Sequence, residues 1–530
     1  MKSIITFCLL SLFLPYSLAK SLAGAVNGKS DQELEIANNI IVEYETPLFS
    51  ANKSAKNYRI PSLLTTKDGV VIAAIDKHEF DNKDWGNIDL VIRRSFDDGK
   101  TWQNDQVVID LVEQPYNAPY FENTQSAFVI DPLMVQDKES ERIFLMIDMY
   151  PESSGIHSHI SYQGKREPAS PANVLGSGYA HIDEQPYLRL KAKDQTYTVR
   201  DPQGNFSTIY DSENKPTNYK VITKGNPNKA YRDLGDLYLG EINEANYQGN
   251  IFLSSQKEFN RSAPFSVEKT SYLWLIYSDD NGKTWSNPVD LNPQLKQDWM
   301  KFLGTGPGTG VQLENGTLLM PVYFIDQNDN EATTVIKSSD GGETWVMGES
   351  PLYSHSKEGG KALYKASESH IVELNNGVIK MFTRTNKGKV LVSTSNTEGM
   401  TWQSSELDDE LLNSYTQLSA IKYSKKINGK EYILLSNAHS KQMWKRINGR
   451  VWIGEIKPDN SIDWQDYIQI TTGNETFGYS SLAELPDGKV GLLYEKVGGE
   501  IRYVRLEVEQ ILKDDKLGQY KRSFFNIFCK

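Results

Sequence analysis

Short apolar runs alternate with polar turns along most of the 530-residue chain. An apolar run at 62–66 is followed by a turn at 67–69 and a second apolar run at 70–75, which is the pattern of a β-hairpin. Further runs at 89–95 and 142–148 continue the series. Glycine and aromatic residues are plentiful, which suits short strands and tight turns better than helical bundles. The pattern therefore predicts an all-β protein.

An eight-residue pattern that ends in Thr-Trp occurs four times, beginning at Ser95, Ser278, Ser338 and, imperfectly, Ser395. The last three copies start 60 and 57 residues apart, which is a period typical of propeller blades. Each copy follows a strand-like run, so we expect a turn in which Asp bonds the local backbone, Gly takes a positive φ and Trp packs between sheets. We expect these turns to be structural and to face away from any ligand.

The first gap between copies, 183 residues, shrinks to one blade length if an insertion of about 120 residues is removed. The polar segment 151–270 carries its own alternating runs, and structureless loops of that length are uncommon. We therefore predict an inserted β-rich domain at 151–270. The catalytic propeller would occupy 20–150 and 271–510, with a C-terminal tail at 511–530; an amphipathic stretch from about Leu506 predicts a short closing helix.

The first 19 residues have the pattern of a secretory signal peptide, with Lys2, an apolar run and small residues before the cleavage position. This predicts a secreted, periplasmic or cell-surface protein. The apolar run is shorter than a membrane span requires, and no later stretch is long and apolar enough for one. Cys8 lies in the predicted signal and Cys529 stands alone, so we expect no disulfide within the mature chain.

Charge and composition exclude several partners. The net charge of −12 argues against nucleic acid. Seven histidines and two cysteines show no metal-ligand spacing, and no glycine-rich loop is suited to phosphates, so we expect neither metal nor cofactor. We also expect a monomer. In an acidic protein, a site for an anionic ligand must concentrate its cations locally.

Several motifs together resemble one family. Tyr58-Arg59-Ile60-Pro61, Asp84-Trp85-Gly86 and the four octets are similar to motifs of the exo-sialidases, or neuraminidases. Within that family, 234–238, 249–251 and 271–310 most resemble the secreted bacterial enzymes that carry an inserted β domain. The resemblance implies a six-bladed β-propeller that acts on sialylated glycans.

The resemblance also implies three arginines, which we identify as Arg59, Arg384 and Arg446 from their local motifs. Sialic acid carries a carboxylate on its anomeric carbon. A planar guanidinium binds a carboxylate through two parallel hydrogen bonds and stays charged at every relevant pH. Outside this context, each of these residues is an ordinary surface cation.

Three further residues match the catalytic groups of the family. Tyr479 would be the nucleophile, Glu368 the base that activates its phenol, and Asp84 the acid that protonates the leaving oxygen and then activates water. A phenol with a pKa near 10 needs such a base. Asp81 and Asp89 compete with Asp84, which is preferred because Trp-Gly follows it.

One position departs from the family pattern. His78 stands where the family often has an arginine, 19 residues after the first one. Two interpretations stay open: a substrate-binding ring that titrates near neutral pH, or a structural histidine.

We therefore expect a retaining exo-α-sialidase that works through a tyrosyl intermediate. One alternative is an intramolecular trans-sialidase that releases 2,7-anhydro-sialic acid, for which Trp444 is a candidate water-excluding aromatic. Another is a non-catalytic glycan-binding propeller. We expect the insertion to supply no catalytic group.

Overall fold

The computed structural model describes residues 42–53, 55–112, 126–152, 154–156, 175–253, 260–356 and 359–513. The predicted signal peptide, both cysteines and most of the predicted tail lie outside these ranges. The described chain is almost entirely β-structure, with the short helices α3 (Asn292–Leu295) and α4 (Val508–Lys513). Helix α4 confirms the predicted closing helix, and no helix of the described chain has the length and apolar character that a membrane crossing needs.

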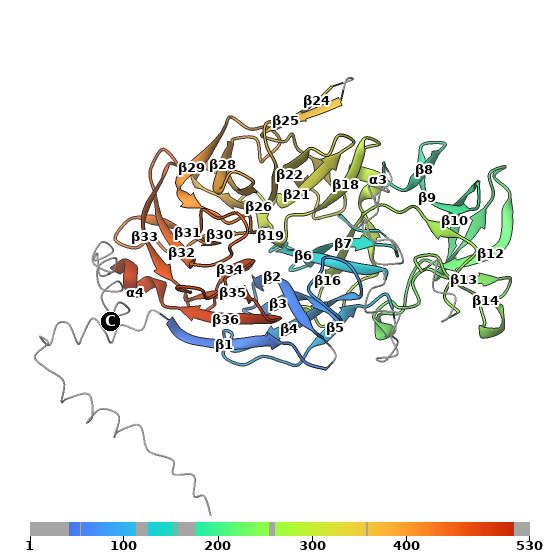
Figure 1. Ribbon diagram of the computed structural model, residues 1–530, viewed down its shortest axis with the longest axis horizontal. Coiled ribbons are helices and arrows are strands. Elements are labelled where there is room, and N and C mark those ends of the chain that lie inside the picture. The colour runs from blue at the N-terminus through green and yellow to red at the C-terminus, as the bar shows by residue number, and fades with distance from the viewer. Residues whose placement is uncertain are drawn as a thin grey trace, which may run out of the picture. The chain divides into compact units, whose positions relative to one another are not determined.

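Six antiparallel sheets form the blades of a propeller, which confirms the predicted fold (Figure 1). Blade 1 contains β2 (Asn57–Thr65), β3 (Val71–His78), β4 (Ile88–Ser95) and β5 (Gln106–Ile109). Blade 2 contains β6 (Phe128–Gln136), β7 (Ile143–Tyr150), β16 (Tyr272–Ser278) and β17 (Val289–Asp290), with β19 (Gly308–Thr309) added parallel to β6. Blade 3 contains β18 (Met300–Thr305), β21 (Leu318–Asp326), β22 (Glu331–Ser338) and β23 (Val346–Met347), with β20 (Val311–Gln312) beside β21.

The remaining blades follow the same plan. Blade 4 contains β26 (Ala366–Glu373), β27 (Ile379–Thr385), β28 (Lys389–Ser395) and β29 (Ser404–Leu412). Blade 5 contains β30 (Ser419–Lys422), β31 (Glu431–Ala438), β32 (Gly449–Ile456) and β33 (Ile462–Gln469). Blade 6 contains β34 (Ser480–Glu484), β35 (Val490–Lys496), β36 (Glu500–Leu506) and β1 (Val42–Ser50).

Strand β1 closes the ring, because the outermost strand of blade 6 comes from the start of the described chain. It pairs antiparallel with β36, from Val42 opposite Leu506 to Ser50 opposite Glu500. Phe49 and Tyr503 are buried in the core that blade 6 shares with blade 1. The start of the described chain is thus held in the last blade by a ladder of hydrogen bonds, and packed side chains join that blade to the first.

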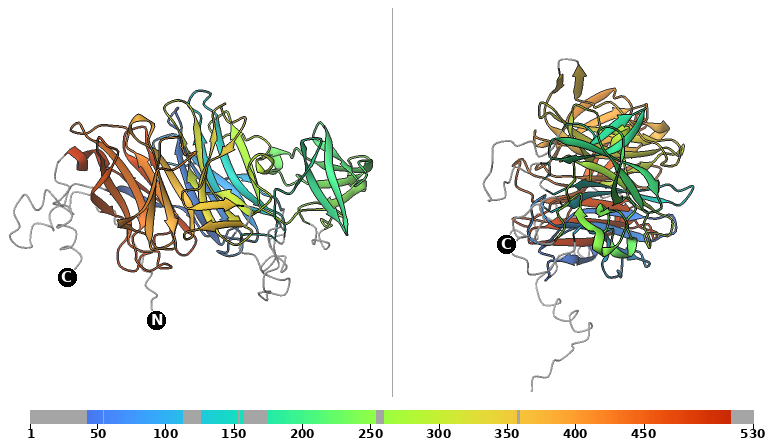
Figure 2. Two further views of the ribbon diagram at one scale, coloured as in Figure 1. Left: turned by 90° about the horizontal axis from the view of Figure 1, so that it is seen from above. Right: turned by 90° about the vertical axis from the view of Figure 1, so that its right-hand side faces the viewer.

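The segment between β7 and β16 forms a separate sheet, β8–β15, that lies beside blade 2 (Figures 1 and 2). Its strands are β8 (Tyr179–Ile182), β9 (Gln185–Ala192), β10 (Gln195–Gln203), β11 (Phe206–Tyr210), β12 (Pro216–Ile222), β13 (Asp236–Leu239), β14 (Tyr247–Asn250) and β15 (Ser266–Val267). Leu190, Val221 and Phe252 of this segment share one hydrophobic core with Trp274 of blade 2. The inserted sheet is therefore packed onto the propeller.

The four octets form matching turns after β4, β16, β22 and β28, and we call these the Asp-box turns. In the first, Asp97 Oδ1 accepts a hydrogen bond from Thr101 N at 2.8 Å, and Trp102 Nε1 donates to Gly99 O at 3.0 Å. Gly99 has φ of +76°, and a Cβ there would lie 2.0 Å from the Tyr503 hydroxyl, so only glycine fits. The turn satisfies its polar groups locally.

The two faces of the propeller differ in what they carry. Strands within a blade are antiparallel, so the first-to-second and third-to-fourth turns lie on one face and the second-to-third loops on the other. The Asp-box turns belong to the first face. The loops at 79–87, 327–330 and 439–448 belong to the second, which we call the site face.

Candidate active site

Backbone irregularities on the inner strands shape the site. The pairing of β2 with β3 shifts register between Arg59 and Ser62, and Ile60 has φ of +56°. A β-branched residue is strained at positive φ, and it persists here because Ile60 N donates a 2.8 Å hydrogen bond to Glu495 Oε1. The pairing of β26 with β27 shifts in the same way between Ala366 and Ser369. Bulges of this kind re-aim side chains next to active sites.

The structure brings the three predicted arginines around one tyrosine, although up to 387 residues separate them in the chain. Arg384 Nη1 donates to the Tyr479 hydroxyl at 2.9 Å, and the guanidinium carbon of Arg446 lies 5.0 Å from the centre of the Tyr479 ring. Arg59 and Arg446 both face Glu495, with nitrogen-to-oxygen distances of 3.6 and 3.8 Å. The three cations therefore lie around Tyr479 and Glu495, and Arg59 and Arg446 also line one pocket together with Asp84.

Tyr479 and Glu368 form a close buried pair. The phenol Oη donates to Glu368 Oε1 at 2.5 Å, within the reach we expected of a nucleophile and its base. Arg384 Nη1 lies 2.8 Å from Glu368 Oε2, so one guanidinium contacts both groups. Burial and the adjacent Glu368 raise the pKa of Tyr479 well above 10, and burial raises the pKa of Glu368. In the resting site the proton accordingly belongs to the phenol.

Asp84 lies on the loop after β3 and pairs with Arg59. Burial alone would raise the pKa of Asp84, but the charge and hydrogen bond of Arg59 outweigh it and lower the pKa. The side chain is 43% exposed, so it is open to a ligand. Its competitors are engaged elsewhere: Asp81 pairs with Lys83 at 2.7 Å, and Asp89 is buried against Lys77 at 2.9 Å.

His78 lies in an enclosed position. Its ring is 1% exposed, and neither ring nitrogen has a hydrogen-bond partner among the described residues. Burial, together with the charge of Arg59, lowers the pKa of His78 to about 3. A pKa this low speaks against titration near neutral pH, and the enclosure favours the structural interpretation of His78 over a sugar contact.

Three acidic residues that the sequence did not single out border the site. Glu495 receives the backbone NH of Ile60 and, at 3.2 Å, that of Tyr479, while it faces two arginines. Glu331 Oε1 lies 3.7 Å from Arg384 Nη2. Burial and the nearby Glu368 raise the pKa of Asp131 well above its usual range. No local motif marks these residues, and only the fold brings them to the pocket.

An aromatic pair stands at the edge of the site. The Tyr415 ring lies 4.5 Å from the guanidinium carbon of Arg384, and its hydroxyl donates to Glu331 at 3.3 Å. The Trp444 ring packs edge-on against Tyr415 at 5.3 Å and is 75% exposed. Through Tyr415, the structure thus connects the exposed Trp444 ring to the arginine that contacts the nucleophile candidate.

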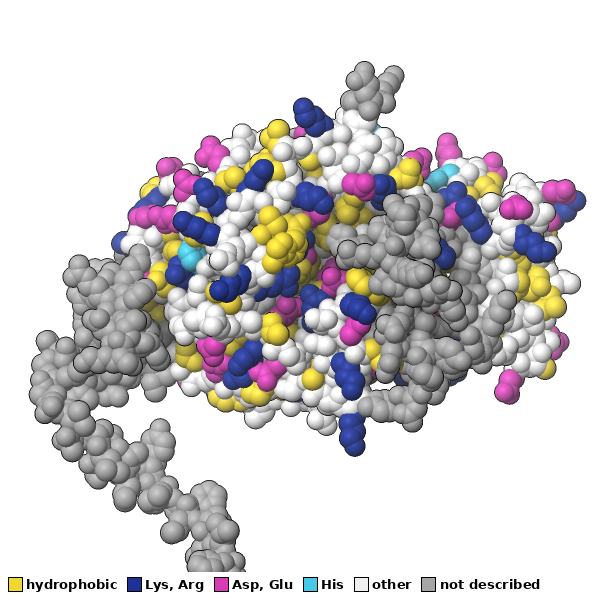
Figure 3. Space-filling model, viewed as in Figure 1, with side chains coloured by type: hydrophobic (Ala, Val, Ile, Leu, Met, Phe, Trp, Pro, Cys, Tyr) yellow, Lys and Arg dark blue, Asp and Glu magenta, His cyan; other side chains and the backbone are white. Residues whose placement is uncertain are grey.

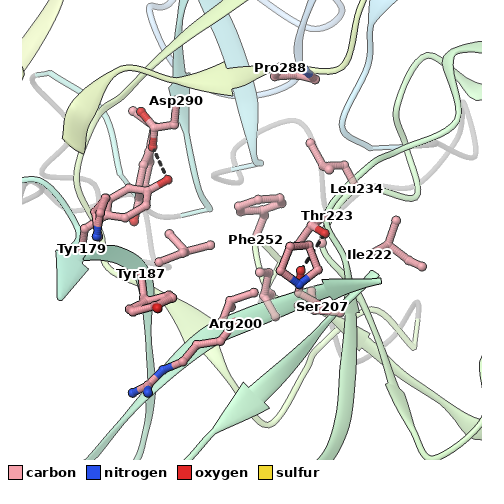
Figure 4. Close-up of a pocket in the computed structure, with 18 of the residues that line it drawn as sticks. Tyr179, Tyr187, Arg200, Ser207, Ile222, Thr223, Leu234, Phe252, Pro288 and Asp290 are labelled. Carbon is pink, nitrogen blue, oxygen red and sulfur yellow. Dashed lines mark hydrogen bonds between the residues drawn. The ribbon is translucent and has the colours of Figure 1, made fainter. Parts of the chain in front are cut away.

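The inserted sheet forms a different pocket, between its own strands and blade 2 (Figure 4). Tyr179 and Asp290 face each other there, and the phenol donates to the carboxylate at 2.9 Å. Ser207 and Thr223 are similarly joined at 3.0 Å. The rest of the lining is mostly aliphatic or aromatic. In the described chain, the hydrogen bonds and ion pairs given above for the Tyr479 cluster come only from propeller residues.

Comparisons with known proteins match this chain to a repeat family and to sialidases. The BNR repeat-like domain family matches residues 242–492. The chain is 32% identical to "Anhydrosialidase" of Macrobdella decora, over 92% of this chain and 64% of that protein. It is 30% identical to "Sialidase B" of Streptococcus pneumoniae, over 94% of this chain and 75% of that protein.

Comparison with solved structures also matches this chain to a sialidase. The intramolecular trans-sialidase from Ruminococcus gnavus, in complex with oseltamivir carboxylate, superposes with a TM-score of 0.68 and 29% identity. The match covers 90% of this chain and 98% of that one. Although the chain spans under two thirds of the Macrobdella decora protein's length, it spans three quarters of the pneumococcal one. The chain therefore belongs to the sialidase family of glycoside hydrolases.

Proposed function

We propose that this protein is a retaining exo-α-sialidase that removes terminal sialic acid from glycans through a tyrosyl intermediate. The observation that carries the proposal is the 2.5 Å hydrogen bond from the Tyr479 hydroxyl to Glu368, with Arg384 in contact with both. A core tyrosine needs only one partner for its hydroxyl. A nucleophilic phenol needs a base and a cation that stabilises the phenolate, and this one has both.

The three arginines would hold the substrate carboxylate. Arg59 is paired with Asp84 and faces Glu495, so protein groups hold its guanidinium in place. A sialic acid carboxylate would replace Asp84 as the partner of Arg59. Charge-assisted, two-pronged hydrogen bonds of this type are among the strongest that side chains make.

That exchange would also prepare Asp84 for catalysis. Arg59 holds the pKa of Asp84 below its usual range. A bound carboxylate shares the charge of Arg59 and adds a negative charge nearby, and both effects raise the pKa of Asp84. A carboxyl group that gains a proton when substrate binds is suited to protonate a leaving oxygen.

In the first step, Tyr479 Oη would form a bond to the anomeric carbon as the bond to the aglycone oxygen breaks. The phenol proton passes to Glu368, and the proton of Asp84 passes to the departing oxygen. A neutral phenol approaches the carboxylate-bearing carbon without the repulsion that a carboxylate nucleophile would meet.

In the second step, an oxygen nucleophile would attack the same carbon and release Tyr479. Asp84 takes the proton of that nucleophile, and Glu368 returns its proton to the phenolate. Two inversions at one centre give net retention of configuration.

The nucleophile of the second step decides the product. Water would give free sialic acid, whereas the substrate's own glycerol side chain would give the 2,7-anhydro sugar. Two observations favour the second product as an alternative: the Macrobdella decora relative is called an anhydrosialidase, and Trp444 exposes an aromatic ring at the edge of the Tyr479 cluster. An aromatic wall excludes water more effectively than it excludes a group tethered to the sugar.

Proton NMR of a sialyllactose digest tests the proposal directly. We expect either free sialic acid or its 2,7-anhydro form to accumulate with lactose. Unchanged sialyllactose, bound but not cleaved by a folded sample, would instead identify a glycan-binding propeller without activity. Trp444→Ala sharpens the product assignment, because loss of the wall should shift a 2,7-anhydro product toward free sialic acid.

A further inference from the structure

We propose that three lysines of the site face, Lys387, Lys441 and Lys445, form a secondary site for an anionic group on the aglycone of the substrate. We call these residues the lysine rim. The inference rests on the proposed sialidase function and extends it to the kind of glycan preferred: one that bears a sulfate or a second carboxylate beyond its terminal sialic acid.

The rim is continuous in space, although two separate loops supply it. The backbone oxygen of Lys441 lies 3.7 Å from the position that a Cβ on Gly388 would occupy, so the loop after β31 touches the turn that contains Lys387. Lys445 follows in the same loop and immediately precedes Arg446. The rim thus leads from the turn after β27 to one of the three arginines.

Charge on the rim is not balanced by nearby acids. The three lysines are exposed, and none forms an ion pair with a carboxylate in the part of the chain that the structure describes. Several other lysines of this acidic protein are paired: Lys425 with Glu509 at 2.7 Å, for example, and Lys389, beside the rim, with Asp409. Glu331, which accepts a hydrogen bond from Tyr415, already engages Arg384 and Lys365.

Unbalanced cations in a chain of net charge −12 create a local positive potential that attracts anions. Figure 3 shows several Lys and Arg side chains around a hydrophobic patch on this face of the propeller; Asp and Glu side chains lie near the centre of the view as well as at its edges. Such a field speeds the encounter with charged ligands, and salt weakens it.

Aromatic rings connect the rim to the reaction centre. Trp444 precedes Lys445 and packs against Tyr415, which in turn packs against Arg384. Lys387 Nζ also lies 5.3 Å from the centre of the Tyr364 ring. A sugar ring stacked on Trp444 would present its substituents to the rim while the terminal sialic acid occupies the arginine pocket. Apolar faces beside a few convergent polar groups are typical of small-molecule sites.

The test compares three substrates: sialyllactose, a sialylated trisaccharide with a sulfate ester on its inner sugar, and a disialylated oligosaccharide. At low ionic strength we expect kcat/KM for the sulfated substrate to exceed that for sialyllactose by about threefold to tenfold, the range of a few exposed charge pairs. High salt should remove the preference. If the disialylated substrate is also preferred over sialyllactose, the rim recognises negative charge alone. If it is not preferred, the rim is selective for sulfate.

The variant Lys387→Gln/Lys441→Gln/Lys445→Gln should lose the preference while its kcat/KM for sialyllactose changes by less than about twofold. The control Lys138→Gln/Lys283→Gln removes two exposed lysines from the opposite face and should keep the preference. An equal preference in the wild type and the rim variant would overturn the inference, as would the absence of any preference. Failure to cleave sialyllactose would instead refute the proposed sialidase function.

Discussion

The Asp-box turns and the site face both contain hydrogen-bonded carboxylates, but the partners of these carboxylates come from different places in the chain. In an Asp-box turn the carboxylate finds its partners within four residues, as Asp280 does with Ser278 and Thr284. On the site face the partners come from distant strands: Tyr479 bonds Glu368 across 111 positions, and Ile60 bonds Glu495 across 435.

This difference separates the residues that stabilise the fold from the residues that would carry out the reaction. A locally satisfied turn repeats because any blade can use it, and its loss affects only its own hairpin. A site held by long-range contacts occurs once and tolerates buried groups whose pKa values are shifted, such as Glu368 and Tyr479. Perturbed titratable groups of this kind cluster at functional sites. Substitutions on the two faces should therefore have separable effects.

The largest effect should come from Tyr479→Phe. We expect kcat to fall by about a thousandfold or more, because the nucleophilic oxygen is lost. Binding of a sialic acid analogue should be largely preserved, since the arginines hold the carboxylate. Steady-state kinetics and calorimetry measure the two quantities, and a fluorinated sialosyl donor should label Tyr479 of the wild type in mass spectrometry.

Tyr494→Phe is the matched control, because the Tyr494 hydroxyl also donates to a glutamate, Glu45, at 3.0 Å, but in blade 6. We expect this variant to retain activity and to lose about 1 kcal/mol of unfolding free energy for one hydrogen bond. Near-normal turnover in Tyr479→Phe, or an adduct on Glu368 or Asp84, would refute the tyrosyl mechanism.

Asp84→Asn should have the next largest effect, and it should depend on the leaving group. With sialyllactose we expect kcat/KM to drop by about 10² to 10⁴, the range for loss of a general acid. An aryl sialoside needs less protonation, so its loss should be smaller. Parallel assays of the two substrates check this, and equal losses for both would argue that Asp84 only positions Arg59.

His78→Gln should change the acid sensitivity of the fold. The pKa of His78 is about 3 in the folded state and near 6.5 when unfolded, so the unfolded chain binds more protons between these values. The wild type therefore loses up to about 1.4 kcal/mol of unfolding free energy per pH unit from this ring as pH falls through that window. Urea unfolding at pH 7, 6, 5 and 4 should show that the unfolding free energy falls less steeply with pH in the variant than in the wild type. An equal fall in both proteins would contradict the low pKa of His78.

The smallest effect should come from the imperfect Asp-box turn. Thr397 supplies one oxygen where the other copies supply two, and that oxygen accepts from Thr401 N at 2.9 Å. Thr397→Asp should raise the unfolding free energy by about 0.5–1 kcal/mol without changing activity. Asp340→Thr makes the reverse change in the third copy and should lower it by a similar amount. Chemical denaturation measures both, and a change in kcat from either would break the separation between the faces.

The propeller was predictable where the sequence repeats. The octets mark the third strands of blades 1 to 4, because each turn needs Asp, Gly and Trp at fixed spacing. Blades 5 and 6 carry no octet, so their strands rest on alternation and on the family resemblance. The pairing of β1 with β36 leaves no mark in the sequence, because ladder hydrogen bonds are made by backbone groups that every residue has.

The six residues assigned at the site came from motifs, and the structure gathers them. Glu495, Glu331 and Asp131 were missed because a lone acid on a strand is indistinguishable from a solvated one until its neighbours are known. The sequence could not decide between the two interpretations of His78 for a related reason. Its pKa depends on enclosure by other strands, and sequence spacing contains no measure of enclosure.

Blade 6 takes its outermost strand, β1, from the start of the described chain, and this has a consequence for how the protein folds. Strand β1 is among the first described segments to leave the ribosome, but its partner β36 ends at Leu506. The ring stays an open arc until β36 has been synthesised, and pairing over such a sequence separation is slow. Arg59 lies on β2, the strand that follows β1 in the chain. Glu495 lies on β35 and Tyr479 immediately precedes β34, both in blade 6. Closure of the ring and assembly of the pocket are therefore the same late event, and an unfinished chain has neither.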